Sequence, residues 1–358
     1  MKNSSKRINR IQKLCEDRII DSNSVAALEK VSENFSFTIT NQMYDLIDKS
    51  NPLDPIALQF IPSENELQMT EGESIDPISD ALFSPVKGIV HRHPDRCLFM
   101  PVHVCPLYCR FCFRREKVGS QAETLLKHEL EIAYDYINEH KEIWEVILTG
   151  GDPLILKPKI LAAIIKKINA IKQVEIIRIH TRVPIVESQR INSDMLAALK
   201  SDKPIYIIIH VNHPKEFTPL ALQACADLAD HGIPLLSQTV LLKGINDNIE
   251  TLTQLMRCCV KNKIKPYYLH QADLAQGTQH FRTSIESGQM LMKQLRGRIS
   301  GLCQPLYVLD IPGGYGKVPI ASPYIKKVDS TIKHEVSYKV EDYQGNLHTY
   351  TPTTKLTK

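Results

Sequence analysis

The sequence predicts an α/β protein built on a partial barrel of six βα units, with an N-terminal helical appendage and a short C-terminal segment. Short β-branched or apolar runs recur from about residue 96, and most of the gaps between them contain a helix-like segment. Six units are too few for a closed eight-stranded barrel, and sites in such sheets form at the carboxyl ends of the strands. The six runs are Leu98–Val102, Trp144–Thr149, Glu175–His180, Ile205–His210, Leu236–Leu242 and Pro266–Leu269.

The remaining elements divide the chain into three regions. Residues 1–90 carry helical patterns at 5–20, 24–32 and 39–49, followed by a Pro- and Ser-rich connector. Residues 91–300 hold the partial barrel, with helices expected at Leu156–Ile171, Ser188–Lys200 and Pro219–His231. Residues 301–358 begin with a seventh strand, Leu306–Asp310, and end in a polar, Thr-rich tail that we expect to be frayed.

The composition is that of an ordinary globular protein and excludes several classes. The formal net charge is only +4 over 358 residues, which does not indicate a nucleic-acid partner. No apolar run approaches the roughly 20 residues that span a bilayer, and the first ten residues lack the apolar core of a signal peptide. We therefore expect a cytoplasmic protein without a membrane partner, whose scattered cysteines are reduced: Cys15, Cys97, Cys225, Cys258, Cys259 and Cys303.

Three cysteines, Cys105, Cys109 and Cys112, follow the first predicted strand in a CxxxCxxC spacing. Three thiolates close together on one loop suit three irons of a [4Fe–4S] cubane and leave the fourth iron open to a small molecule. An enzyme that generates radicals from S-adenosylmethionine (SAM) needs such an open iron. A zinc site with His103 or Cys97 as fourth ligand is the main alternative, and a buried structural trio is the other.

Two glycine motifs follow predicted strands. Gly150, Gly151 and Asp152 come directly after the second strand, where paired glycines let a backbone approach a ligand; a plain βα turn is the alternative. The run Asp310–Lys317 is glycine-rich and ends in a lysine, but it lacks the glycine and the Ser or Thr that a phosphate-binding loop requires. Lys317 on such a loop suits Schiff-base chemistry with pyridoxal phosphate (PLP), against the alternative of a surface lysine.

Four arginines form two cationic pairs next to these motifs. Arg92 and Arg96 lie just before the first strand of the barrel, and Arg114 and Arg115 directly follow the cysteines. Guanidinium pairs bind phosphate or carboxylate through bidentate hydrogen bonds. The alternative for Arg92 and Arg96 is solvated surface charge.

These motifs together resemble the lysine 2,3-aminomutase family of radical SAM, PLP-dependent enzymes. The resemblance runs from about His91 to about Pro319, roughly two-thirds of the chain, and the motifs follow one another in the family's order. The matching stretches are His91–Arg96, Cys105–Arg115, Thr149–Leu154, Arg178–Arg182, His210–Pro214, Ser237–Asp247, Pro266–Thr283 and Asp310–Lys317.

The resemblance implies a role for each candidate residue. Cys105, Cys109 and Cys112 would ligate the [4Fe–4S] cluster, and Lys317 would be the catalytic lysine that carries PLP. The other implied contacts are Arg92, Arg96 and Gln238 to the PLP phosphate, Gly150, Gly151, Asp152 and His210 to SAM, Arg114 to the substrate carboxylate, and Asp273 and Asp310 to its distal ammonium.

The implied reaction moves the α-amino group of L-lysine to Cβ and gives (R)-β-lysine, after an external one-electron reductant has activated the cluster. Electrostatics supports the predicted role of the two aspartates independently of the resemblance, because an ammonium group that enters a dry pocket needs compensating negative charge. A family member that uses glutamate would not be expected to keep two anions there. The alternative is that Asp273 caps a turn and Asp310 ends a strand.

The chain also departs from the longer, catabolic members of the family, which carry a C-terminal zinc-binding extension and a cysteine after a Gly-Ile/Val-Asn-Asp run. Here Asn248 follows that run, and no cysteine occurs after Cys303. We therefore expect no intersubunit zinc site, which leaves the form of any homo-oligomer open. The chain resembles the EpmB-type branch, which makes (R)-β-lysine for translation elongation factor P and its lysyl ligase. The alternatives are an aminomutase of free-lysine metabolism or of another amino acid, and a degenerate relative that only binds.

Overall fold

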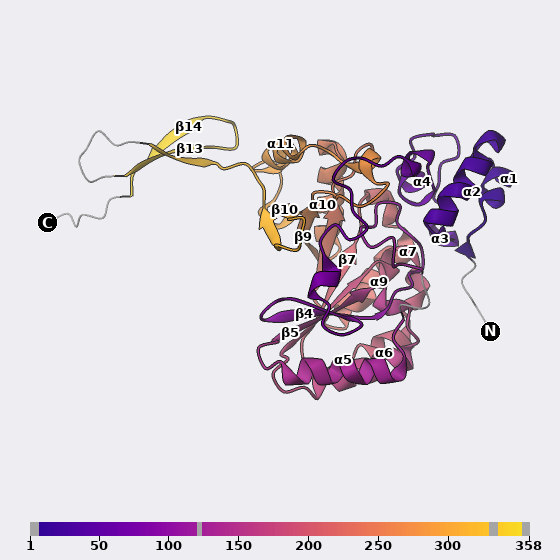
Figure 1. The fold of residues 1–358 in the computed structure, drawn as a ribbon. Helices are drawn as coiled ribbons and strands as arrows, with labels where there is room; N and C mark the ends of the chain where they lie inside the picture. The colour runs from indigo at the N-terminus through magenta and orange to yellow at the C-terminus, as the bar shows by residue number, and fades with distance from the viewer. Residues whose placement is uncertain (1–6, 120–123, 329–335, 353–358) are drawn as a thin grey trace.

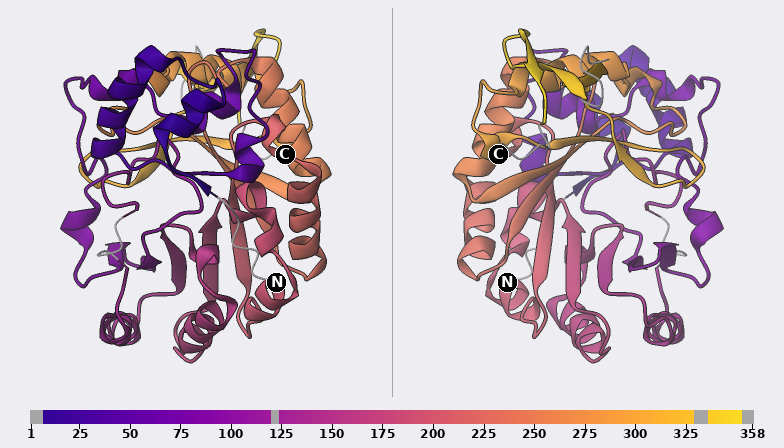
Figure 2. Two further views of the ribbon diagram at one scale, coloured as in Figure 1. Left: turned by 90° about the vertical axis from the view of Figure 1, so that its right-hand side faces the viewer. Right: turned by 90° about the vertical axis from the view of Figure 1, so that its left-hand side faces the viewer.

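The computed structural model describes residues 7–119, 124–328 and 336–352, and its centre is one nine-stranded sheet. The strand order is β11-β10-β9-β8-β7-β6-β5-β4-β3, so neighbours in the sheet are also consecutive along the chain. Strands β4 to β10 are parallel to one another, and only the edge strands β3 and β11 are antiparallel. Figures 1 and 2 show the strands fanning in an arc with helices along its outer side. The predicted α/β class is confirmed, and the finer description as a six-unit partial barrel stays a prediction.

All seven predicted parallel strands are present, with ends that differ by at most two residues from the expected ones. Strand β7 shows why these strands form. Its four isoleucine side chains are buried, some on one face of the sheet and some on the other, as is typical of a parallel strand covered on both sides. The strands are β4 (Arg96–Val102), β5 (Glu145–Gly150), β6 (Ile176–Thr181), β7 (Ile205–His210), β8 (Leu235–Val240), β9 (Ile264–His270) and β10 (Leu306–Asp310), flanked by β3 (Ile89–His93) and β11 (Lys317–Pro319).

The crossover helices begin at sequence signals for helix N-termini. Thr218 and Asn248 accept hydrogen bonds from the backbone N–H groups three residues ahead, so Asn248 acts as a helix cap here. The predicted helix Ser188–Lys200 is wrong in its first half, because it divides into a 3-10 turn and a short helix. The helices are α5 (Lys127–Glu139), α6 (Pro158–Asn169), α7 (Val183–Val186), α8 (Ser193–Ala198), α9 (Pro219–Asp230), α10 (Ile249–Lys261) and α11 (Ile285–Leu295).

The N-terminal region is mostly helical, but two of its three predicted helices begin incorrectly. Strand β1 (Arg7–Ile8) pairs antiparallel with β2 (Ile39–Thr40), and both lie inside ranges for which the sequence predicts helix. Tertiary packing overrides the helical pattern there, since Ile39 is fully buried in the core cluster that also includes the sheet. The helical elements are α1 (Ile11–Glu16), α2 (Val25–Asn34), α3 (Asn41–Tyr44), α4 (Pro55–Phe60) and the 3-10 turns η2 (Glu64–Leu67) and η3 (Asp80–Phe83).

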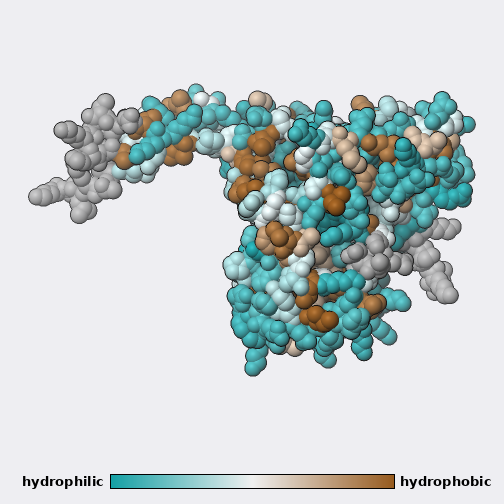
Figure 3. All heavy atoms as spheres, viewed as in Figure 1, coloured by the Kyte–Doolittle hydropathy of each residue, from teal (hydrophilic) through white to brown (hydrophobic). Residues whose placement is uncertain are grey.

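The C-terminal segment forms an arm that extends from the body of the molecule (Figure 1). Strands β12 (Ile325–Val328), β13 (Ser337–Glu341) and β14 (Leu347–Tyr350) pair antiparallel in a separate three-stranded sheet. The prediction of a frayed tail is therefore wrong as far as β14, while residues 353–358 lie outside the described residues. In Figure 3 the visible surface is mostly hydrophilic with small apolar patches, some of them on this arm.

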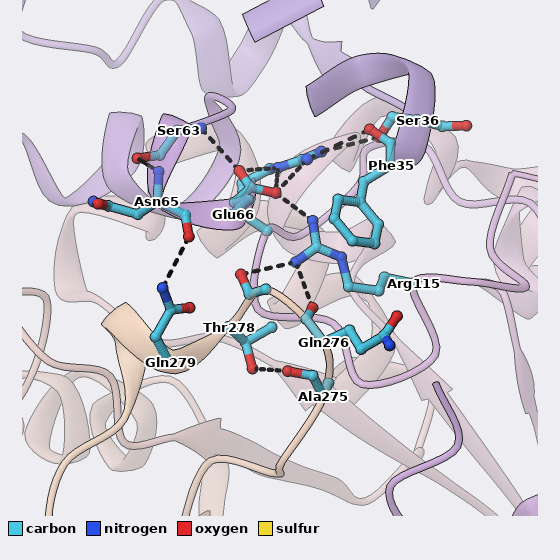
Figure 4. Close-up of polar contacts among 12 residues, drawn as sticks. Phe35, Ser36, Ser63, Asn65, Glu66, Arg115, Ala275, Gln276, Thr278 and Gln279 are labelled. Carbon is cyan, nitrogen blue, oxygen red and sulfur yellow. Dashed lines mark hydrogen bonds and ion pairs between the residues drawn. The ribbon is translucent and has the colours of Figure 1, made fainter. Parts of the chain in front are cut away.

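A buried carboxylate, Glu66, ties the N-terminal region to the cysteine loop (Figure 4). Its side chain is fully buried and accepts hydrogen bonds from Arg110, at 2.6 Å from the terminal nitrogen Nη2, and from Arg115. Arg110 also donates to the carbonyl of Ser36 at 2.9 Å, and Arg115 donates to the carbonyl of Gln276 at 3.3 Å. Because Arg110 stands between two of the three cysteines, Glu66 holds their loop against two distant segments.

We expect Glu66→Ala to destabilise the protein by about 3–5 kcal/mol, because it leaves two buried guanidinium groups without their shared counter-ion. Urea unfolding followed by circular dichroism measures this loss. Glu64→Ala is the matched control, since Glu64 is exposed on the same turn and its removal should change stability by less than about 0.5 kcal/mol. Equal losses for the two variants would contradict the role of Glu66.

Candidate active site

The glycine-rich loop before Lys317 spans the gap between the two edges of the sheet. A Cβ atom on Gly314 would come within 2.4 Å of the Phe83 ring, and one on Gly316 would lie 3.4 Å from the His93 ring. Both glycines have positive φ, at +82° and +93°, which suits residues without a side chain. The loop can therefore lie against β3 and η3, and it brings Lys317 to the start of β11, opposite the end of β10.

Lys317 forms an ion pair with Asp310 at that point. The ammonium nitrogen Nζ of Lys317 also lies 3.4 Å from Nδ1 of His270. Nδ1 of His270 in turn lies 3.2 Å from Oδ2 of Asp310. Burial lowers the pKa of Lys317, although the Asp310 carboxylate opposes this shift. Burial would raise the pKa of Asp310, but the hydrogen bond from His270 and the Lys317 charge hold it below its usual range. Asp310 thus already holds an ammonium group in this structure.

Asp273 lies beside this pair with a carboxylate that lacks a partner. Burial and the nearby Asp310 carboxylate raise the pKa of Asp273 to about 7, although Lys317 and Arg114 oppose that shift. No hydrogen bond or ion pair reaches the Asp273 side chain from the part of the chain that the structure describes. The predicted aspartate pair is thus assembled near Lys317, and one member has no fixed counter-ion.

Asp80 joins two of the predicted arginines. Its Oδ1 accepts from Arg92 at 3.1 Å and its Oδ2 from Arg114 at 2.7 Å, and all three side chains are largely buried. Arg92 also acts on Lys317, whose pKa it lowers through its charge. Arg96 differs from these, since it pairs with the adjacent Asp95 at 2.6 Å and its side chain is 36% exposed.

Histidines line the inside of the sheet between these groups. Nδ1 of His180 lies 3.2 Å from Nε2 of His210, and burial lowers the pKa of His210 to about 3, so both rings are neutral. Gln238 is half-buried on β8, in register with His210 on β7. The predicted site residues of β7, β8 and β10 therefore share one region with Lys317.

Several buried polar atoms in this region have no hydrogen-bond partner among the described residues. They belong to His180, His270, Arg92 and Arg178. Buried polar groups are normally paired, and unpaired ones in a site are expected where a polar ligand binds. The orphaned atoms and the cationic and anionic side chains around Lys317 fit polar cofactors such as PLP and SAM.

The three cysteines supply the donor type that a cubane cluster takes, and their thiols are not gathered as closely as the ligands of one zinc ion. Burial raises the pKa of all three thiols, to about 11 for Cys112, and they act on one another electrostatically. Two ligands of one zinc ion lie within about 4.6 Å of each other, since zinc–sulfur bonds are about 2.3 Å long. Among the described residues, the only group of three donors within 4.8 Å of one another is His91, His140 and Glu142. In the described part of the chain, the three thiols, with or without His103 or Cys97, therefore do not form such a compact group. Their ligation of a cluster stays a prediction.

The Gly150-Gly151-Asp152 turn packs directly on the start of the cysteine loop. A Cβ on Gly151 would come within 2.4 Å of the Val104 carbonyl oxygen, so only glycine fits there. The Asp152 carboxylate accepts from the Thr181 hydroxyl and from the backbone N–H of Arg182, both at 2.7 Å. The hydrogen bonds of this carboxylate therefore go to the end of β6. The binding of SAM by this turn stays a prediction.

Comparison with known proteins agrees with this geometry. The radical SAM superfamily matches residues 100–256 of the chain. An L-lysine 2,3-aminomutase of Fusobacterium nucleatum is 40% identical over 319 residues, which cover 89% of this chain and 74% of that protein. The enzyme of the same name from Methanococcus maripaludis is 42% identical over 85% of this chain and 71% of its own. The chain belongs to the lysine 2,3-aminomutase family of radical SAM enzymes.

Members of this family are isomerases that use a [4Fe–4S] cluster, SAM and PLP, so the predicted enzyme class and cofactors are confirmed. The aminomutase family also includes a glutamate 2,3-aminomutase of Clostridioides difficile, which is 37% identical over 83% of this chain and 70% of that protein. Family membership alone therefore does not identify the amino acid substrate, which must be inferred from the side chains of the site. In the described part of the chain, none of the helices is both long and apolar enough to cross a membrane.

The sequence reasoning missed three residues that hold this aminomutase site together. Asp80 and Glu66 lie in the Pro- and Ser-rich connector, to which the sequence analysis assigns no site residue, and Arg182 lies in a matching stretch without an assigned role. Glu66 had a detectable signal, because it completes a capping box with Ser63. Asp80 had none, since only the folded chain places it between two arginines.

We expect Asp80→Asn to raise the KM for lysine about tenfold and to weaken PLP retention, because Arg92 and Arg114 lose the charge that orients them. Steady-state kinetics and PLP content after dialysis measure the two effects. The control is Asp21→Asn, at an exposed position. Unchanged KM and PLP content in Asp80→Asn would show that the two ion pairs do not shape the binding site.

Proposed function

We propose that this protein converts L-lysine to (R)-β-lysine. The observation that carries the proposal is the arrangement of charges beside Lys317, where Asp310 holds an ammonium group and no hydrogen bond or ion pair from the described residues reaches the Asp273 carboxylate. Lysine brings a second ammonium group, and placing it between these carboxylates would compensate the charge of both. Arg114, which interacts electrostatically with Asp273, would take the substrate carboxylate.

Each remaining residue has a role in this proposal. Cys105, Cys109 and Cys112 hold the cluster, Lys317 carries PLP, Arg92, Arg96 and Gln238 hold its phosphate, and the turn at Gly150, Gly151 and Asp152, with His210, binds SAM. When bound, these cofactors supply the radical and stabilise the migrating nitrogen. The protein orients the lysine chain between Arg114 and the aspartates and excludes water from the inside of the sheet.

Glutamate as substrate fits this site poorly. Its side-chain carboxylate would lie next to Asp273 and Asp310, and neighbouring like charges repel one another strongly in a buried site. The raised pKa of Asp273 already reflects the repulsion by Asp310. A glutamate-specific pocket would instead need a cationic or neutral donor at these positions.

We further propose that the product modifies translation elongation factor P through its lysyl ligase. This part is supported by the resemblance to the EpmB-type branch and by Asn248, which caps α10 where longer members have a cysteine. Incubating the enzyme, the ligase and elongation factor P with lysine should give a factor carrying β-lysine, measured by intact mass. An unmodified factor in the presence of β-lysine would favour the alternative of free-lysine metabolism.

The anaerobically reconstituted enzyme should convert L-lysine to β-lysine with SAM, PLP and dithionite, without net loss of SAM. Mass spectrometry of the product is the measurement, with arginine, ornithine and glutamate as competing substrates. We expect Lys317→Ala to abolish turnover and to keep the cluster absorbance, whereas Lys326→Ala, an exposed lysine on β12, should keep full activity. Turnover in Lys317→Ala would refute its role, and a preference for glutamate would refute the substrate.

Lysine binding should release a proton through Asp273. The pKa of this carboxyl is about 7 in the free protein, so at about pH 6 it is mostly protonated. An arriving ammonium lowers that pKa, and the carboxyl ionises and gives up about one proton per lysine. At about pH 8.5 the carboxyl is already ionised, and the release disappears.

Anaerobic calorimetry of the protein without PLP, in which Lys317 is still an ammonium group, measures this proton release in buffers with different ionisation enthalpies. Asp273→Asn should bind lysine more weakly and release no proton at either pH. The exposed Asp202→Asn is the matched control and should behave as the wild type. Equal release by Asp273→Asn would assign the proton to another group.

A further inference from the structure

Arg182 places a buried guanidinium group against one of the three cysteines. The residue follows β6 directly, its side chain is 8% exposed, and its terminal nitrogen Nη1 donates to Sγ of Cys109 at 3.0 Å. This hydrogen bond acts on the thiol, since the charge of Arg182 is the main effect that opposes the rise in the pKa of Cys109 caused by burial.

Two acceptors fix the other side of the guanidinium plane. Nη2 donates to Oε2 of Glu216 at 2.6 Å and to Oε1 of Gln59 at 3.0 Å. Glu216 is itself fully buried, and its other oxygen accepts from the backbone N–H groups of Asn212 at 2.9 Å and His213 at 2.8 Å. A planar fork can meet a sulfur and two oxygens at once, which a lysine ammonium on a flexible stem cannot match.

The backbone of Arg182 is held as firmly as its side chain. Its N–H donates to Oδ2 of Asp152 at 2.7 Å, and Oδ1 of the same carboxylate accepts from Thr181. Asp152 belongs to the glycine turn that packs on the cysteine loop, so the loop, the turn and the end of β6 form one connected unit. Such support is typical of residues that orient and tune metal ligands.

We propose that Arg182 sets the reduction potential of the iron–sulfur cluster through its hydrogen bond to Cys109, and that Glu216 moderates this effect. The inference rests on the proposed ligation by Cys105, Cys109 and Cys112. Taking up one electron from an external reductant makes the cluster more negative. A cationic donor at a ligand sulfur stabilises that reduced state, and a nearby carboxylate destabilises it.

The test is a redox titration of the full-length, anaerobically reconstituted protein, followed by electron paramagnetic resonance. At the wild-type midpoint potential, Arg182→Gln should lower the ratio of reduced to oxidised cluster about tenfold, a shift of about 59 mV for one electron. Glu216→Gln should shift the ratio in the opposite direction, because it removes a negative charge and leaves the arginine in place. General loosening of the site would not give shifts of opposite sign.

Arg182→Gln leaves Glu216 buried without its cation and could prevent folding. The double variant Arg182→Gln/Glu216→Gln removes both charges and the cationic donor together, and it should still shift toward a more negative potential. Lys167→Gln is the control for a change of one charge, since Lys167 is exposed on α6.

The outcomes separate this inference from the proposed function. Clusters that assemble in every variant with unchanged potentials would overturn the role of Arg182 and leave the ligation intact. A wild-type protein that assembles no cluster would overturn both. Shifts of opposite sign for Arg182→Gln and Glu216→Gln, with the iron content of a cubane in each, would support the inference.

Discussion

The structure depends on the neutralisation of cationic side chains that are buried around one site. Four carboxylates supply the opposite charge: Glu66 for Arg110 and Arg115, Asp80 for Arg92 and Arg114, Glu216 for Arg182, and Asp310 for Lys317. A buried charge without a partner costs several kcal/mol, so each pair must form for the chain to fold in this way. The cations come from the cysteine loop, the edge strand, β6 and the glycine loop. The anions therefore determine how these segments fit together.

This constraint explains why the N-terminal region is part of the site. Glu66 and Asp80 both lie outside the parallel sheet, and they reach Arg110 over 44 residues and Arg114 over 34 residues of sequence. Apolar packing alone would bury the helices of this region against the sheet without specifying the position of the cysteine loop. The ion pairs add direction to that packing, because a guanidinium group donates well-aligned hydrogen bonds to a carboxylate only in a few orientations.

Sequence reasoning succeeded where the signal is local and failed where it depends on contacts between distant segments. The strands of the parallel sheet were predictable because each contains a short β-branched or apolar run, and β7 begins and ends at the predicted residues, Ile205 and His210. The strand pair β1–β2 was missed, since two-residue strands have no period and form only by pairing with each other. In the site, the cysteines and Lys317 belong to recognisable motifs, whereas Asp80 and Arg182 acquire their roles only through partners far away in the chain.

Asp273 departs from this rule of compensation, and the departure points to the substrate. No hydrogen bond or ion pair from the described residues reaches its carboxyl, and burial and the Asp310 charge raise its pKa to about 7, so it holds a proton more firmly than an ordinary carboxyl group. Asp310 forms an ion pair with Lys317, the residue that the proposed reaction requires for PLP, and a hydrogen bond with His270. Once Lys317 carries the cofactor, its ammonium no longer pairs with Asp310, and two neighbouring carboxylates are left without that cation. The distal ammonium group of a substrate such as lysine would neutralise these carboxylates, whereas a substrate without such a group would leave their charge uncompensated.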